Sequence, residues 1–109
     1  MSKKTIGWFY FKLTTNGNLI GEFSNNNDVE KIYTESADSI DEEKPEISFV
    51  GNYISTWQEN NIPKFAHLKI DLKHKGRYSL IWTNKKKKKI FIGYGILANN
   101  MIVGDYREV

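Results

Sequence analysis

The chain of 109 residues contains no cysteine and only two histidines, and this scarcity excludes several kinds of site. Without thiols there is no disulfide, no cysteine-ligated zinc, no thiol nucleophile and no dithiol redox motif. His67 and Asp71 share one face of an extended segment, but four residues of strand separate their side chains by roughly 13 Å, too far to ligate one metal ion together. The sequence therefore predicts neither a metal site nor a cofactor.

Long apolar runs are also missing, because no segment approaches the roughly 20 apolar residues that a membrane-spanning helix needs. The segment "MSKKTIGWFYF" (1–11) has a basic pair and a short aromatic run but no small-residue cleavage site, so it is predicted to be a strand rather than a signal peptide. No serine or threonine lies in a nucleophile elbow, and there is no glycine-rich phosphate loop. We therefore expect a cytoplasmic protein that does not bind membranes and is not an enzyme.

The positive net charge of the chain comes from one run of five lysines. The chain has 16 Lys+Arg and 13 Asp+Glu, a net charge of +3, and without the run the count is 11 against 13, or −2. Nucleic-acid-binding proteins usually spread cations over a face and combine them with aromatic stacking platforms, and this run contains no arginine and no aromatic residue. It is interpreted as a hairpin turn; nucleic-acid or anionic-surface binding is the alternative, and a nuclear-import signal is a third. The contacts in the nucleic-acid alternative are Lys85, Lys86, Lys87, Lys88 and Lys89.

Aromatic and β-branched residues are abundant, and they alternate with polar residues. In "FAHLKIDLK" (65–73) the even positions are apolar and the odd ones mostly polar, which is the pattern of a half-buried strand. Turn signals at short intervals predict eight strands, and the acidic segment 35–44 is predicted to be a loop. The predicted strands are 5–13, 18–24, 28–36, 46–57, 64–73, 77–83, 89–97 and 101–108. We predict one all-β domain, an eight-stranded antiparallel up-and-down β-barrel, with a β-sandwich as the alternative.

Glycines recur in one phase of the predicted strands. In "NLIGEF" (18–23), "VGNY" (50–53) and "MIVGDY" (101–106), each glycine lies two residues before an aromatic residue, and "FIGYGIL" (91–97) contains two glycines, Gly93 and Gly95, in the phase of Phe91. An inward glycine lets a strand bend sharply or lets another side chain lie over its backbone. This pattern favours a tightly closed barrel.

Three segments carry a resemblance to a known group of barrels: "GNYISTW" (51–57), "YSLIW" (78–82) and "FIGYGILANNMIVGDY" (91–106). Together they are similar to the second half of calycin-like barrels, the group of avidins, lipocalins and fatty-acid-binding proteins. The chain lacks the capping helix of the fatty-acid-binding proteins and the G-x-W opening of secreted lipocalins. The resemblance implies a barrel with a small-molecule pocket, and it does not identify the ligand.

If the glycine–aromatic phase faces inward, a set of aromatic side chains lines the lumen. Tryptophan and tyrosine offer flat apolar walls with a hydrogen-bonding tip, which suits a small apolar or cyclic ligand. Ser55, Thr34 and Ser36 are the best polar candidates. The alternative is that the rings only fill a narrow barrel, and a perturbed carboxylate inside it would instead favour an enzyme. The predicted ligand-binding residues are Phe23, Phe49, Tyr53, Ser55, Trp57, Tyr78, Trp82, Phe91 and Tyr106.

Two segments, "IGWFYF" (6–11) and "IFIGYGI" (90–96), are apolar on both faces, although a barrel strand needs only one apolar face. If the first strand adjoins the seventh or eighth, these second faces form an exposed apolar patch, and such patches mark interfaces. We expect a homodimer or higher oligomer, with a membrane or a partner protein as the alternative. The predicted interface residues are Trp8, Tyr10, Ile92 and Tyr94.

Overall fold

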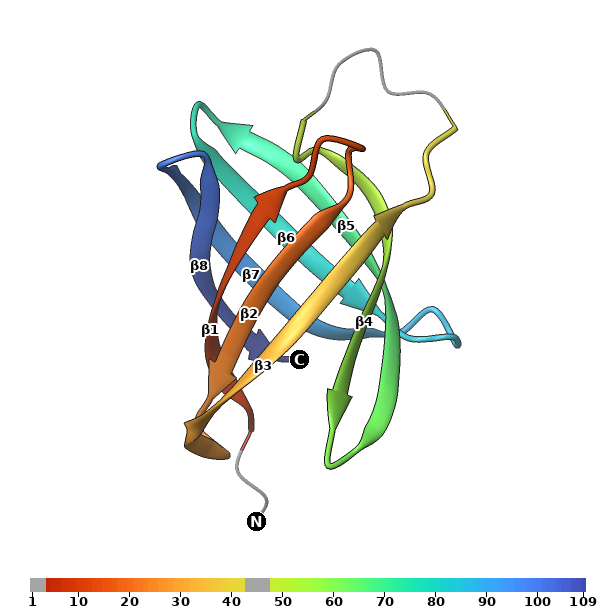
Figure 1. Ribbon diagram of the computed structural model, residues 1–109, viewed down its shortest axis with the longest axis vertical. Coiled ribbons are helices and arrows are strands. Elements are labelled where there is room, and N and C mark those ends of the chain that lie inside the picture. Colours follow the sequence, from red (N-terminus) through yellow and green to blue (C-terminus); the bar gives the residue numbers. More distant parts are fainter. Residues whose placement is uncertain (1–3, 43–47) are drawn as a thin grey trace.

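The computed structural model describes residues 4–42 and 48–109, and it contains eight antiparallel strands (Figure 1). Each strand pairs with the next, and β8 pairs with β1, so the sheet closes into a barrel with up-and-down connections. This confirms the predicted barrel rather than the sandwich, and no helix occurs within the described ranges. The strands are β1 (Ile6–Leu13), β2 (Leu19–Asn25), β3 (Asp28–Ser39), β4 (Gly51–Glu59), β5 (Ile62–His74), β6 (Arg77–Thr83), β7 (Lys89–Ala98) and β8 (Met101–Glu108).

The strand boundaries agree with the predicted ones except around the β3–β4 connection. β3 continues to Ser39, beyond the predicted strand end at residue 36, so the alternative assignment of 35–44 to a loop is wrong for residues 35–39. Inward Glu35 and Ala37 alternate there with exposed polar neighbours, and the polar composition concealed this period of two. β4 begins later than the predicted residue 46, which lies outside the described residues together with 43–45 and 47.

The predicted inward phase is confirmed along most strands. On β5 the apolar phase is buried from Ala66 to Ile70, but Leu72, at its end, is 52% exposed. Leu72 is the last residue before a register shift with β6, between Leu72 and His74, where the regular ladder ends. The buried core includes Phe9, Phe11, Leu19, Ala37, Leu68, Ile70, Leu80 and Ile102.

The two ends of the barrel differ in how they are filled. At the end that bears the β1–β2, β5–β6 and β7–β8 turns, the rings of Phe49 and Tyr78 lie 6.0 Å apart, and the Tyr53 hydroxyl donates to the Phe49 carbonyl oxygen over 2.8 Å (Figure 1). The other end holds both termini and the β2–β3, β4–β5 and β6–β7 turns. There β4 pairs with β3 only as far as Trp57 and β5 with β6 only from His67, so the tip of the β4–β5 hairpin stands apart from its neighbours.

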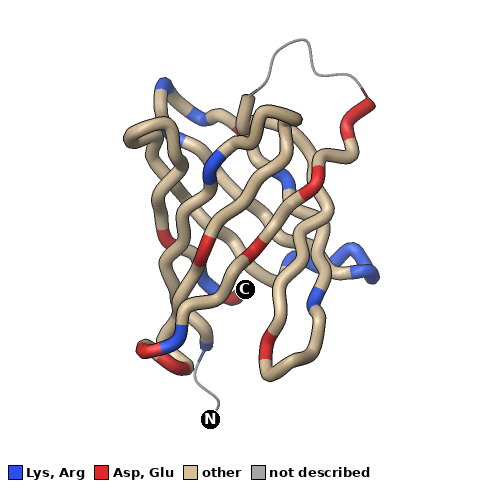
Figure 2. Tube along the Cα trace, in the orientation of Figure 1, with Lys and Arg blue, Asp and Glu red and all other residues tan. Residues whose placement is uncertain are grey.

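The lysine run forms the β6–β7 turn, which projects from the barrel (Figure 2), and all of Lys85–Lys89 is exposed. The side-chain oxygen of Asn84 accepts hydrogen bonds from the backbone N–H groups of Lys86 (2.9 Å) and Lys88 (3.0 Å). Lys87 adopts a left-handed conformation with φ of 62°. These backbone contacts confirm the hairpin interpretation of the run.

Candidate functional site

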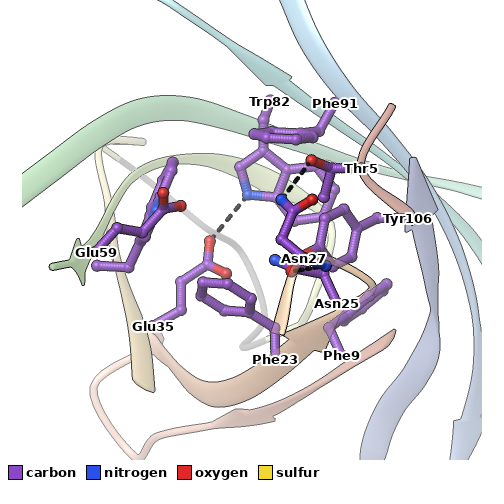
Figure 3. Close-up of a pocket in the computed structure, with 11 residues that line it drawn as sticks. Thr5, Phe9, Phe23, Asn25, Asn27, Glu35, Glu59, Trp82, Phe91 and Tyr106 are labelled. Atoms are coloured by element: carbon purple, nitrogen blue, oxygen red, sulfur yellow. Dashed lines mark hydrogen bonds between the residues drawn. The ribbon is translucent and has the colours of Figure 1, made fainter. Parts of the chain in front are cut away.

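A cavity of about 90 Å³ lies inside the barrel, toward the end that holds the termini (Figure 3). Its walls are aromatic side chains from six different strands, each at an inward position of its strand. Polar side chains from the strands and the adjoining turns complete the lining. The aromatic residues are Phe9, Phe23, Trp57, Trp82, Phe91 and Tyr106, and the polar ones are Thr5, Asn25, Asn27, Glu35 and Glu59.

Edge-to-face and tilted contacts hold the rings in place. Tyr106 is central: its ring lies 5.5 Å from that of Phe91 and 6.0 Å from those of Phe23 and Trp82. The ring of Phe9 meets Trp82 edge-on at 5.9 Å. Such geometries are favourable for aromatic quadrupoles, and the mutual contacts restrict the rotamers of the rings. The aromatic wall is therefore preformed.

Glu35 is the least expected member of the site, because it is a carboxylate that is only 5% exposed. Its Oε2 accepts hydrogen bonds from the hydroxyl of Ser55 and from Nε1 of Trp82 (2.9 Å), whereas the described residues supply no hydrogen bond to Oε1. Burial raises the pKa of Glu35 to about 7, and the two hydrogen bonds oppose this rise only in part. A second carboxylate, Glu59, accepts a hydrogen bond from Nε1 of Trp57 (2.9 Å) and is half-buried.

A chain of polar contacts forms one side of the cavity. Asn25 donates through Nδ2 to the hydroxyl of Tyr106 (3.1 Å) and accepts from the backbone N–H of Asn27 (3.0 Å). Asn27 in turn donates through Nδ2 to Oγ1 of Thr5 (2.9 Å). Burial raises the pKa of Tyr106 to about 12, so its phenol is neutral at physiological pH. The β2–β3 turn is thereby tied to the start of β1 beside the cavity.

The structure brings part of the predicted ligand site together and separates the rest. Ser55 is fully buried, and its contact with the site is its hydrogen bond to Glu35. Thr34 and Ser36 are exposed, and the Ser36 hydroxyl lies 3.0 Å from that of Thr56. The predicted residues that line the cavity are Phe23, Trp57, Trp82, Phe91 and Tyr106, whereas Phe49, Tyr53 and Tyr78 lie toward the opposite end.

Sequence reasoning missed Glu35, although a signal for it was present. Tyr33, Glu35 and Ala37 occupy alternate positions, and Ala37 continues the inward phase, so a strand through 33–39 places the carboxylate inside. The polar rim residues Asn25 and Asn27 had no comparable signal, because asparagine in a turn is usually explained by backbone geometry alone.

The outer wall formed by β7, β8 and β1 carries exposed aromatic residues on either side of β8. β8 lies between β7 and β1, and Asp105 is paired with both Trp8 and Tyr94, so the outer faces of these strands adjoin. Trp8 and Tyr94 are each 55% exposed, whereas Tyr10 and Ile92 are half-buried. β1 is therefore a neighbour of β8 as expected, but the exposed Asp105 lies between the apolar outer faces of β1 and β7, and the interface itself stays a prediction.

Within the described part of the chain, no group of three or more His, Asp or Glu side chains is arranged to hold a metal ion. No helix there has the length and apolarity to span a membrane. Comparisons of the chain with protein-family models, with curated proteins and with solved structures find no match. The function is therefore inferred from the geometry of the barrel and its cavity.

Proposed function

We propose that this protein is a non-enzymatic binding barrel of calycin type for a small molecule. The observation that carries the proposal is the preformed cavity, whose walls are six aromatic rings and whose five polar side chains are held by hydrogen bonds. Apolar walls combined with placed polar groups that fix the orientation of a ligand are typical of ligand sites. At about 90 Å³ the cavity is well below the roughly 300–1,000 Å³ typical of drug-sized ligands, so it suits a small compound or the head group of a larger one.

Trp57→Ala tests this function, with Trp8→Ala as its matched control. Trp57 forms part of the cavity wall and its ring meets Phe23 edge-on at 6.3 Å, whereas Trp8 lies on the outer wall. We expect Trp57→Ala to weaken binding about tenfold or more, because a desolvated aromatic contact is lost, and Trp8→Ala to leave it unchanged.

The measurement is native mass spectrometry of freshly purified protein for co-purified compounds, followed by a ligand-observed NMR screen of small fragments. Hits that lose affinity in Trp57→Ala and keep it in Trp8→Ala support the proposal. A screen without hits, or hits whose affinity is unchanged in Trp57→Ala, would contradict the proposed binding function.

One observation favours a second candidate, an enzyme that uses Glu35 as a general acid or base. A buried carboxyl group with a pKa of about 7 is suited to proton transfer near neutrality. Ser55, the hydroxyl that contacts Glu35, is fully buried and does not line the cavity, so it is poorly placed as a nucleophile. Binding is therefore the preferred function, and chemical turnover of a captured compound, abolished in Glu35→Gln, would favour the enzyme instead.

Binding of nucleic acid or an anionic surface through Lys85–Lys89 stays the alternative function that the sequence leaves open beside small-molecule binding. The hydrogen bonds of Asn84 explain how the run forms a turn without invoking a partner. A cytoplasmic location likewise stays a prediction.

We also propose that the protein self-associates through the outer wall of β7, β8 and β1. Tyr94 and Trp8 lie on this wall with Ile96, which is likewise exposed. Tyr94→Lys replaces an exposed aromatic ring of this wall with a charged side chain, so we expect it to shift the protein from dimer to monomer in sedimentation velocity. Ile54→Lys is the matched control, because Ile54 is an exposed apolar residue on β4, at the opposite side of the barrel, and should not change the mass. A wild-type monomer would contradict the proposal.

A further inference from the structure

The buried carboxyl group of Glu35 has no cationic partner among the residues that the structure describes. Among the described residues that line the cavity, none is lysine, arginine or histidine. The partners of Glu35 are the neutral hydrogen-bond donors Ser55 and Trp82, and both use Oε2. A buried carboxylate is normally paired with a cation, because its desolvation is otherwise uncompensated. A ligand that carries a positive charge would supply the missing partner at Oε1.

The aromatic wall has the complementary property. The faces of tryptophan, tyrosine and phenylalanine rings carry negative potential, and rings that surround a cation attract it most strongly where water is excluded. Phe9, Phe23, Trp82 and Tyr106 are all at least nine-tenths buried, so the cage that they form is largely desolvated. Glu59 adds a second carboxylate to the lining, and with Glu35 it gives the cavity two acidic groups and no basic one.

We propose that the cavity binds a small organic cation, an alkylated ammonium group of a few heavy atoms, with Glu35 as its counter-ion and the aromatic rings as its cage. This inference rests on the proposed binding function and names its ligand class. A neutral head group that donates hydrogen bonds to Glu35 is the competing outcome, and the experiment separates the two.

Binding of such a cation depends on the protonation of Glu35. The titratable groups that share the cavity with it are Glu59 on β4 and Tyr106 on β8, and the Tyr106 phenol stays neutral below about pH 12. Since the pKa of Glu35 is about 7, the fraction of ionised carboxylate falls about tenfold between pH 8 and pH 6. A permanently charged ligand does not titrate in this range, so a pH effect on its affinity reports on the protein.

The experiment compares two probes of one shape, choline and its uncharged carbon analogue 3,3-dimethyl-1-butanol. Titration calorimetry of the full chain with each probe gives the dissociation constants at about pH 8 and about pH 6. We expect choline to bind about tenfold more tightly than the analogue at the higher pH, and this preference to fall severalfold at the lower pH. In Glu35→Gln, which keeps an acceptor for Ser55 and Trp82, choline should lose about tenfold in affinity and the analogue should not.

The controls separate Glu35 from other carboxylates. Glu30→Gln alters an exposed carboxylate on the same strand and should change neither affinity, and Glu59→Gln should retain the pH dependence. If Glu35→Gln does not fold, the pH comparison of the two probes on the wild type decides alone. Equal binding of both probes, or preference for the analogue, overturns the cation proposal but leaves small-molecule binding intact. If neither probe binds while fragments sensitive to Trp57→Ala do, only the cation proposal falls; if no fragment binds either, the proposed function falls with it.

Discussion

Glu35→Gln is expected to raise the free energy of unfolding by about 3 kcal/mol at about pH 8 and to leave it nearly unchanged at about pH 4. Burial raises the pKa of this carboxyl group from 4.5 to about 7 in the folded protein. Between these values the folded state binds a proton that the unfolded state has released, so wild-type stability falls as the pH rises through this window. Above about pH 7 the Glu35 carboxyl group is ionised in both the folded and the unfolded state, so folding carries the full free-energy cost of burying its charge. Glutamine has no charge to bury, so the variant does not carry this cost.

Urea unfolding of the wild type and of Glu35→Gln across this pH range measures the effect. The difference in unfolding free energy should grow by about 1.4 kcal/mol for each pH unit inside the window and level off above it. Glu30→Gln, at an exposed position of the same strand, should run parallel to the wild type. If the Glu35→Gln curve also runs parallel to the wild type, the carboxyl group is not buried as the structure has it.

A stabilising substitution at the cavity has a functional meaning. Natural proteins keep destabilising groups chiefly where activity needs them, so an ionised Glu35 that opposes folding is consistent with a binding role. The hydrogen bonds from Ser55 and Trp82 lower the free-energy cost of burying the ionised carboxylate without removing it. A cationic ligand at Oε1 would offset more of the free-energy cost of burying the ionised carboxylate. Glu35 would then account for both the pH dependence of stability and the preference for a cationic ligand.

Gly104→Ala is expected to destabilise the barrel by about 3 kcal/mol, because β7 and β8 approach each other too closely there for a side chain. A β-carbon at Gly104 would overlap the carbonyl oxygen of Tyr94 and lie 2.7 Å from the Cα of Gly95. Both obstacles are backbone atoms of the neighbouring strand, so no rotamer change relieves them. Thermal and urea unfolding would measure the loss, together with broadened NMR signals along β7 and β8.

Gly93→Ala is the matched control for this prediction. Its β-carbon would lie 3.0 Å from the carbonyl oxygen of Asp105 and 3.1 Å from Cζ3 of Trp82, distances that a small shift of the ring and strand can accommodate. We expect a loss of about 1 kcal/mol, clearly smaller than that of Gly104→Ala. Equal losses in the two variants would show that the close approach at Gly104 does not limit the packing of the barrel.

The sequence by itself determined the strands, their inward phase and the nature of the lysine run. Side-chain alternation is a local property, because successive residues of an extended chain point to opposite faces whatever the strand packs against. The eight-stranded barrel, the inward Tyr53, Ser55 and Trp57, and the turn at Lys85–Lys89 all follow from this period and from turn chemistry. Segment 35–39 was the exception, since its polar composition resembled a loop.

Only the tertiary structure decided which inward residues meet. Glu35 receives its hydrogen bonds from Ser55 and Trp82, which are 20 and 47 residues away along the chain. The closure of β8 on β1 brings Tyr106 beside Phe23, and the length of the lumen separates these rings from Phe49, Tyr53 and Tyr78 at the other end. The burial of a carboxylate depends on the shear and closure of the whole sheet, which set the depth of each side chain in the barrel and which no local pattern encodes.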